Sequence, residues 1–183
     1  MGKKKQIPDR WMDYAPMKEA FLDARIIPIK VPLPDHRFCN DYMYQYKWTP
    51  TDVMTGIPNV GLIIDATYKT PPYYDPREFT SQGIEYAKVM CAGHFVPSEE
   101  VYQQFSEIVK RFLLDPRNNG KIIAMHCTHG VNRTGYLLCR YLIENLNYPP
   151  AQALDTFAMT RGHPVERDNY KEALFNLPIV RRF

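Results

Sequence analysis

The sequence lacks the marks of an exported, membrane-spanning or zinc-binding protein. Its four cysteines form neither a CxxC pair nor a pattern with the spacing of a zinc site. No apolar run approaches the roughly 20 residues that a membrane-spanning helix needs, and residues 1–10 are basic and polar, without the apolar centre of a signal peptide. A net charge of +3 is too small to indicate nucleic-acid binding by itself. We therefore expect an intracellular protein that crosses no membrane.

What the sequence does contain is the composition of one globular domain. Of its 183 residues, 45% are hydrophobic and 23% are charged, which favours a folded chain with a sizeable core over a disordered one. We expect residues 1–183 to form a single domain, with residues 1–6 as a flexible tail.

Short apolar segments alternate with segments of helical periodicity. Strands are predicted at 25–31, 61–67, 85–90 and 122–125, and helices at 99–114, 136–146, 151–160 and 166–177. Pro28 suits an edge strand, Ser98 suits a helix N-cap, and Thr49 or Thr51 suits the cap of a short helix. This alternation predicts an α/β fold in which helices flank both faces of a central, mostly parallel twisted sheet.

One stretch of ten residues, HCTHGVNRTG at 126–135, carries the chemistry of the sequence. It separates the last predicted strand from the helix at 136–146, which predicts a strand, a tight loop and a helix. A loop closed by Gly130 and leading into a helix directs its backbone N–H groups at one point, where the helix dipole adds positive potential. The stretch therefore predicts an anion-binding site.

Cys127 and Arg133 flank this loop and face the same predicted anion. A guanidinium binds phosphate through two parallel hydrogen bonds, and the positive field lowers the pKa of the thiol, so that Cys127 becomes a thiolate near neutral pH. The ordinary alternative is that Cys127 is a small buried core residue. The arginine six positions later, with Gly130 between them and Thr134 directly after it, favours a nucleophile.

The stretch resembles the signature loop of the cysteine-dependent phosphatases, the protein tyrosine and dual-specificity phosphatases, whose pattern is HC, five residues, R and then S or T. The resemblance implies the protein tyrosine phosphatase-like fold, with Cys127 as nucleophile, Arg133 as phosphate clamp and Thr134 stabilising the thiolate as a leaving group. His126 would lie beside the thiolate. It further implies that the phosphate is held by the loop residues Thr128, His129, Gly130, Val131, Asn132 and Arg133.

The aspartate by which these phosphatases protonate the leaving group is missing where it is expected, because residues 93–98 contain no Asp or Glu. A tyrosyl leaving group has a pKa near 10, and loss of its general acid costs roughly 10²- to 10⁴-fold. A leaving phosphate has a pKa of about 6 and departs without a donor, so the absence favours phosphoanhydride substrates. His94, Glu99 and Asp65 are candidate acids, although Asp65 equally suits hydrogen bonds to loop amides.

Three further segments sharpen the resemblance: IPDRWMDY at 7–14, GLIIDAT at 61–67 and RGHPVERDNY at 161–170. Together with the loop they resemble the RNA 5′-triphosphatase branch of the superfamily, especially its stand-alone members, one of them baculoviral, over nearly the whole chain. The resemblance implies removal of the γ and then the β phosphate from 5′-triphosphorylated RNA, through a cysteinyl-phosphate and without a metal or another cofactor. It also implies a monomer in the nucleus or cytoplasm, with ribonucleoprotein or small-RNA-processing factors as partners.

Other readings stay open at this stage. The chain could be a protein dual-specificity phosphatase or a catalytically silent RNA binder. Arg161 and Arg167 suit either the distant phosphates or surface charge paired with Glu166 or Asp168, and Lys30 and Arg37 are expected to face solvent rather than the site. Five tyrosines suit either base stacking or local packing: Tyr42, Tyr44, Tyr46, Tyr73 and Tyr74.

Overall fold

A computed structural model of the chain describes residues 7–178. Its four strands form one sheet in the order β1-β4-β2-β3, and every strand pair is parallel. The strands are β1 (Ile26–Ile29), β2 (Val60–Asp65), β3 (Glu85–Lys88) and β4 (Ile122–His126). The predicted parallel sheet is confirmed, and β1, which contains Pro28, lies at its edge as expected.

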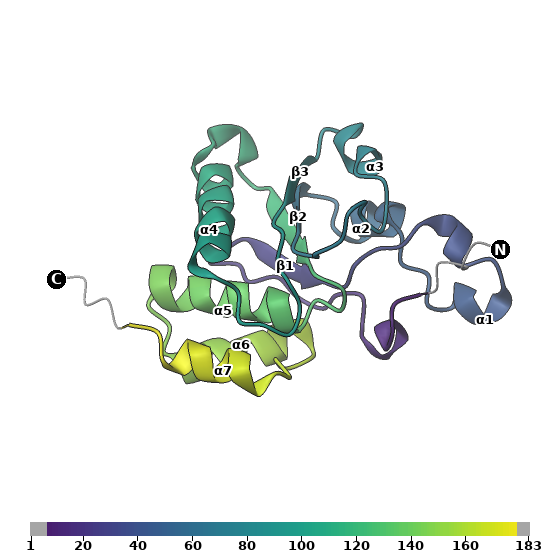
Figure 1. The fold of residues 1–183 in the computed structure, drawn as a ribbon. Helices are drawn as coiled ribbons and strands as arrows, with labels where there is room; N and C mark the ends of the chain where they lie inside the picture. Colours follow the sequence, from purple (N-terminus) through teal and green to yellow (C-terminus); the bar gives the residue numbers. More distant parts are fainter. Residues whose placement is uncertain (1–6, 179–183) are drawn as a thin grey trace.

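Helices cover both faces of the sheet, which confirms the predicted layers (Figure 1). On one face lie α4 (Glu99–Leu114), α5 (Asn132–Leu146), α6 (Pro150–Arg161) and α7 (Asp168–Phe175). The short helices α1 (Asp41–Tyr44), α2 (Pro50–Gly56) and α3 (Arg77–Thr80) lie toward the other side, and the 3₁₀ turns are η1 (Trp11–Asp13), η2 (Asp35–Arg37) and η3 (Pro116–Asn118). None of the helices within residues 7–178 is both long and apolar enough to cross a membrane.

Helix caps appear where the sequence predicts them. The Thr49 side chain accepts from the backbone N–H of Asp52, while the Asp52 carboxylate accepts from that of Thr49, and this reciprocal capping box starts α2. Ser98 caps α4 through a single bond, in which its hydroxyl oxygen accepts from the backbone N–H of Val101. Two predicted starts are wrong: α5 begins earlier, at Asn132, and α7 begins later, at Asp168, because the two residues before Asp168 are bonded to the Asn132 side chain.

The central position of β4 brings the reactive loop to the carboxyl edge of the sheet. His126, the last residue of β4, is in register with Ile29 of β1 and Asp65 of β2. Cys127 therefore follows directly at the edge where three strands end, which is where parallel α/β sheets bind ligands.

The N-terminal segment packs against this same edge through a buried lysine. Lys30 is almost fully buried, and its Nζ donates to the carbonyl oxygens of Tyr14 (2.8 Å) and Trp11 (3.2 Å) while lying 3.6 Å from the centre of the Trp11 ring. The expectation that Lys30 faces solvent is wrong. Burial and the charge of Arg161 lower the pKa of Lys30 to about 8, and the side chain anchors residues 11–14 beside the loop.

Candidate active site

The loop after β4 requires glycine at position 130. Gly130 has a φ of +69°, and a Cβ at this position would lie 2.1 Å from the carbonyl oxygen of Ile29. Only glycine combines this left-handed conformation with so close a backbone approach. The loop is therefore pressed against the end of β1, and α5 begins immediately after it.

Arg161 fixes the orientation of the loop peptides from beneath. Its side chain is fully buried, and the guanidinium donates to the carbonyl oxygens of Gly130 (3.0 Å), His129 (2.9 Å) and Ala15 (2.7 Å). Because a trans peptide directs its N–H opposite to its C=O, carbonyls drawn toward Arg161 turn the following amides the other way. Arg161 neither lines the cavity above Cys127 nor lies at the surface, so both roles expected for it are wrong.

Cys127 lies at the floor of the site with a thiol that ionises readily. Burial raises the pKa of Cys127, but the charge of Arg133, the hydroxyl and N–H of Thr134 and the N–H of Val131 outweigh burial and lower it to about 7. No other residue of 7–178 competes for the buried Thr134 hydroxyl, which leaves it available to the Cys127 thiolate. A substantial fraction of Cys127 is thus thiolate at neutral pH.

Two hydrogen bonds within the protein orient the Arg133 guanidinium. One terminal nitrogen donates to the carbonyl oxygen of Cys91 (3.1 Å) and the other to the hydroxyl of Thr128 (3.0 Å). These two bonds tie the guanidinium to the segment after β3 and to the loop itself. A guanidinium oriented in advance loses less freedom when it binds phosphate.

Behind Cys127, His126 and Asp65 form a buried support. The Nδ1 of His126 lies 2.9 Å from the Cys127 carbonyl oxygen and its Nε2 lies 2.7 Å from the hydroxyl of Tyr74. Because a carbonyl oxygen only accepts, Nδ1 carries a proton, and burial lowers the pKa of His126. The sequence offered Tyr74 as a base-stacking candidate, but it is buried here.

Asp65 is fully occupied in this support and does not line the cavity. Its carboxylate accepts from the N–H and hydroxyl of Thr67 (2.9 and 2.6 Å) and from the hydroxyl of Tyr86 (2.7 Å), and it pairs with Lys88 at 3.0 Å. Although burial acts to raise the pKa of Asp65, His126 and these donors lower it overall. The role of general acid proposed for Asp65 is therefore wrong, and its alternative as a structural acceptor is confirmed.

A cavity of about 430 Å³ opens above Cys127 and is walled by segments far apart in the sequence. Tyr73 and His94 come from the middle of the chain, and His94 has a strained φ of +72°. The remaining walls are the loop residues Cys127, Thr128, His129, Asn132 and Arg133, the N-terminal residues Pro8, Asp9, Arg10 and Tyr14, and Gly93, Glu166, Arg167 and Tyr170. Of the five tyrosines considered for base stacking, only Tyr73 lines this cavity.

Asn132 joins the loop to the C-terminal wall. Its side-chain oxygen accepts from the backbone N–H groups of Glu166 (2.9 Å) and Arg167 (3.0 Å). The sequence predicts that Asn132 and His129 maintain the shape of the loop, and these bonds agree with that role for Asn132. They also bring Arg167 into the cavity wall, as one of the two alternatives left open for it by the sequence requires.

Comparison of the sequence with known protein families identifies the family of this chain. The family model described as "Dual specificity phosphatase, catalytic domain" matches residues 42–178. The chain belongs to the dual specificity phosphatase family. Residues 7–14, which form one wall of the cavity, lie ahead of the part that this family model matches.

Relatives within the family carry two kinds of name. A Caenorhabditis elegans "RNA/RNP complex-1-interacting phosphatase homolog" is 38% identical over 98% of this chain and 79% of its own length, and the human "RNA/RNP complex-1-interacting phosphatase" is 41% identical over 97% of this chain. A "Tyrosine-protein phosphatase" of Autographa californica nuclear polyhedrosis virus is 37% identical over 91% of this chain and 98% of its own. The chain spans only about half of the human relative, 54% of its length.

Solved phosphatase structures share the fold of this dual specificity phosphatase. Tk-PTP in its active form has a TM-score of 0.66 at 17% identity, covering 87% of this chain and 93% of its own. PTPMT1 in complex with PI(5)P has a TM-score of 0.61 at 18% identity, covering 84% and 89%. The predicted protein tyrosine phosphatase-like fold is thereby confirmed.

The acidic side chains at the site of this dual specificity phosphatase differ from those that the sequence proposed. Glu99 lies on α4, bonded to Gln103 (2.6 Å) and Arg140 (2.5 Å), and does not line the cavity. The cavity instead receives Asp9 and Glu166, which sequence reasoning missed because they are 157 residues apart in the chain. Both lie in segments, IPDRWMDY and RGHPVERDNY, that the sequence singled out only for their resemblance.

Glu166 is unsuited to protonate a leaving group. Its carboxylate accepts from the hydroxyl of Tyr14 at 2.6 Å and contacts both terminal nitrogens of Arg10 at 3.4 Å. Partial burial acts to raise the pKa of Glu166, but the Tyr14 and Arg10 donors lower it overall, so the group is ionised at neutral pH. His94, the one candidate acid from the sequence that does line the cavity, and Asp9 are the side chains left for that task.

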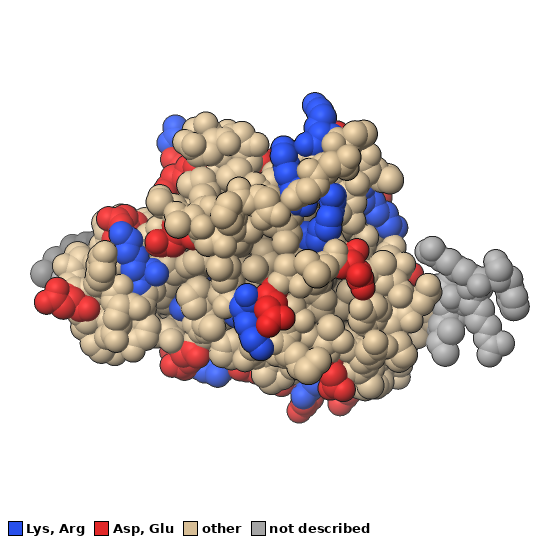
Figure 2. Space-filling view, turned by 180° about the vertical axis from the view of Figure 1, so that it is seen from behind, with Lys and Arg blue, Asp and Glu red and all other residues tan. Residues whose placement is uncertain are grey.

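Basic side chains also gather on the surface away from Cys127. Figure 2 shows Lys and Arg side chains gathered at the upper right, the end of the molecule that carries α4.

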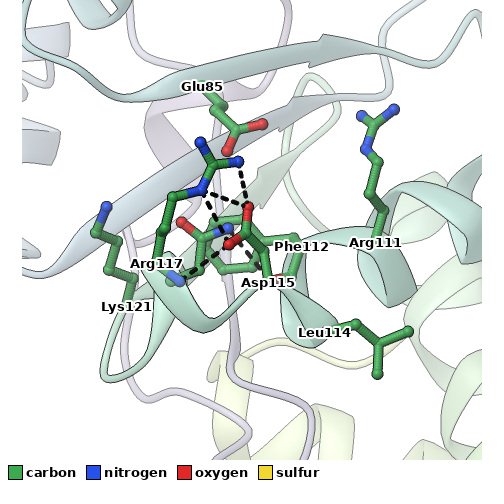
Figure 3. Close-up of a pocket in the computed structure, with 8 residues that line it drawn as sticks. Glu85, Arg111, Phe112, Leu114, Asp115, Arg117 and Lys121 are labelled. Carbon is green, nitrogen blue, oxygen red and sulfur yellow. Dashed lines mark hydrogen bonds and ion pairs between the residues drawn. The ribbon is translucent and has the colours of Figure 1, made fainter.

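A second cavity of about 760 Å³ lies at the opposite edge of the sheet from Cys127, where β3 and β4 begin (Figure 3). There Asp115 neutralises Arg117 through bonds of 2.6–3.1 Å, and Glu85 adds a further negative charge beside it. No cysteine or histidine lines this second cavity.

Proposed function

We propose that this dual specificity phosphatase is an RNA 5′-polyphosphatase, which removes the γ and then the β phosphate of 5′-triphosphorylated RNA and leaves a 5′-monophosphate. The proposal rests on the residues that form the cavity wall next to Arg133. That wall includes a second arginine, Arg167, and no hydrogen bond or ion pair with another residue of 7–178 engages its side chain. A phosphomonoester needs only the loop and Arg133, whereas a chain of phosphates needs further cations along its length.

Each half of the reaction follows from groups already in place. The Cys127 thiolate attacks the terminal phosphorus, so that an S–P bond forms while the bond from phosphorus to the bridging oxygen breaks. The electrons of that bond leave on the shortened RNA as a phosphate oxygen. Water then attacks the cysteinyl-phosphate, the S–P bond breaks, and inorganic phosphate leaves with the proton going to solvent.

The loop stabilises the charge that develops during both steps. Loop amides from His129 to Arg133 and the Arg133 guanidinium surround the equatorial oxygens, where preorganised donors contribute most to phosphoryl transfer. Thr134 stabilises the Cys127 thiolate when it leaves in the second step. A leaving diphosphate end carries its own charge and needs no proton donor, which agrees with the ionised state of Glu166.

The names of the relatives agree with an RNA substrate. Both the nematode and human relatives are named for interaction with RNA/RNP complex 1, and we extend RNA binding and ribonucleoprotein partners to this chain on that basis. The viral relative is named as a tyrosine-protein phosphatase. Because Asp9 lines the cavity, hydrolysis of phosphoproteins is the second candidate function, with Asp9 as the acid.

The test follows each phosphate of a synthetic RNA. An oligoribonucleotide labelled at its γ, β or α phosphate is incubated with the enzyme in EDTA, beside Cys127→Ser. We expect γ label to be released first, β label second and α label not at all, with no release by Cys127→Ser. Retention of all label on RNA, by an enzyme that hydrolyses a phosphotyrosine peptide, would refute the proposal and favour the second candidate. Binding of RNA without turnover of either substrate would favour a silent RNA binder.

A further inference from the structure

One cation in the cavity wall has no place in the mechanism so far. Arg10 lies on the N-terminal segment, ahead of residues 42–178 that match the family model. Its side chain is 55% exposed, with Glu166 at 3.4 Å and Asp13 at 3.6 Å. The residue therefore adds to the common catalytic domain a guanidinium that shares a cavity with Cys127.

The backbone that carries Arg10 is fixed to the phosphate loop. His129 Nε2 donates to the carbonyl oxygen of Asp9 at 2.6 Å, and the Tyr14 ring packs against the His129 ring with 4.9 Å between centroids. Arg10 itself has a φ of +57°, a conformation that costs a non-glycine residue energy and is concentrated at functional sites. Through His129, the loop at 127–133 thus also fixes the position of the Arg10 backbone.

The contacts that hold the Arg10 side chain are weak enough to be exchanged. Both bonds to Glu166 are 3.4 Å long, whereas charge-assisted bonds from arginine to carboxylate or phosphate are normally about 2.7–2.9 Å. Exposed ion pairs of this kind contribute little to the free energy of folding. Glu166, by contrast, keeps its short bond to Tyr14 and stays in place if Arg10 turns away.

We propose that Arg10 determines specificity for 5′-polyphosphate ends by binding the phosphate next to the one that Cys127 attacks. Glu166 holds the guanidinium at the cavity wall, and the second phosphate of a bound substrate replaces Glu166 as its partner. A phosphomonoester, which has no second phosphate, makes no use of Arg10. This inference rests on the proposed function and names the residue that separates the two substrate classes.

The test compares two substrates across matched variants. The kcat/KM values of wild type, Arg10→Met, Arg10→Lys and Glu166→Gln are measured with 5′-triphosphate RNA and with p-nitrophenyl phosphate. Arg77→Met is the control, since Arg77 is also an exposed arginine paired with an aspartate, Asp75, but lies outside the cavity. Thermal unfolding of each variant accompanies the kinetics.

We expect Arg10→Met to lose about 10- to 100-fold on RNA, the effect of one or two charge-assisted bonds, and less than about 3-fold on p-nitrophenyl phosphate. Arg10→Lys should fall between wild type and Arg10→Met on RNA. Glu166→Gln, which frees Arg10 and removes a negative charge from the cavity, should lower the KM for RNA, and Arg77→Met should match wild type.

Equal losses by Arg10→Met on both substrates, or none on RNA, would overturn the role of Arg10 while leaving the proposed function intact. Failure of wild type to act on RNA while it hydrolyses p-nitrophenyl phosphate would overturn both. If Arg10→Met unfolds at a much lower temperature, binding of inorganic tripolyphosphate and of orthophosphate to Cys127→Ser and to Cys127→Ser/Arg10→Lys replaces the kinetics. Weakening confined to tripolyphosphate supports the proposal, and equal weakening of both overturns it.

Discussion

The Nε of Arg161 donates a 3.0 Å hydrogen bond to the carbonyl oxygen of Gly130, from beneath the loop that follows β4. Because Arg161 is fully buried, this guanidinium supports the loop without meeting substrate. It lies at the end of α6, next to Gly162, which ends the helix in the left-handed conformation. Arg161 thus connects the end of α6 directly to the loop that contains Cys127.

Replacing Arg161 should therefore damage both stability and catalysis. In Arg161→Met, three carbonyl oxygens lose their donor, and a buried acceptor without a partner costs about 1–3 kcal/mol, so we expect the free energy of unfolding to fall by about 3 kcal/mol or more. We also expect kcat to fall about 100-fold, because misplaced loop amides stabilise the transition state poorly. Urea unfolding and steady-state kinetics measure the two effects.

The control for this prediction is Arg111→Met, an exposed arginine on α4, which should change neither quantity. Inhibition by orthovanadate adds a readout of loop geometry, and we expect it to weaken in Arg161→Met and recover partly in Arg161→Lys. A fully active Arg161→Met enzyme would show that the loop holds its shape without this support.

The Thr134 hydroxyl should control both the ionisation of Cys127 and its departure as a thiolate. With a pKa of about 7, Cys127 should be alkylated by iodoacetamide at a rate that rises with pH and levels off above about pH 8. In Thr134→Val the thiolate loses a hydrogen bond, so the midpoint should move upward, toward the ordinary cysteine pKa of about 8.5. Hydrogen bonds to charged groups are worth about 1.5–3 kcal/mol, which predicts a kcat about 10- to 100-fold lower.

The alkylation is best measured in a Cys39→Ser background, because Cys39 is exposed. Cys91 and Cys139 are buried, and burial raises the pKa of each, to about 12 for Cys91, so neither should react in this range. An unchanged midpoint in Thr134→Val would mean that Arg133 and the backbone N–H groups alone set the pKa of Cys127.

Asp9 should be dispensable for RNA and needed for a phosphotyrosine peptide. If a phosphate leaving group departs without a donor, Asp9→Asn should change the RNA kcat by less than about 3-fold, while peptide hydrolysis, slow to begin with, should lose about 10²-fold. His94→Gln, made in parallel, tests the other side chain left for this task. A 10²-fold loss on RNA in either variant would identify a general acid that the proposed mechanism omits.

The sequence was most informative where chemistry is local. The strand, loop and helix around HCTHGVNRTG were predictable because Cys127, Gly130 and Arg133 lie within seven consecutive residues, and the Thr49 and Ser98 caps were predictable because a cap acts within one turn. Asp9 and Glu166 were missed because nothing near either residue indicates that the chain brings them together. That proximity depends on Lys30, Tyr14 and Asn132, whose bonds span distant segments.

Buried polar residues were the other source of error. Arg161, Lys30 and Asp65 are charged residue types that usually lie at the surface, and each is buried here because it satisfies carbonyl oxygens, or in the case of Asp65, donors. The partners of Arg161 and Lys30 are backbone carbonyl oxygens, which every residue carries. A sequence therefore gives no pairing signal for such contacts.

The central claim, that the terminal phosphate of RNA is the preferred target of Cys127, is tested most directly by a competition. The enzyme receives equal concentrations of a 5′-triphosphate oligoribonucleotide and a phosphotyrosine peptide in EDTA, beside Cys127→Ser, and both products are followed over time. We predict a kcat/KM at least about 100-fold higher for the RNA, and no turnover by the variant. Faster dephosphorylation of the peptide would contradict the account and would make this chain a protein phosphatase.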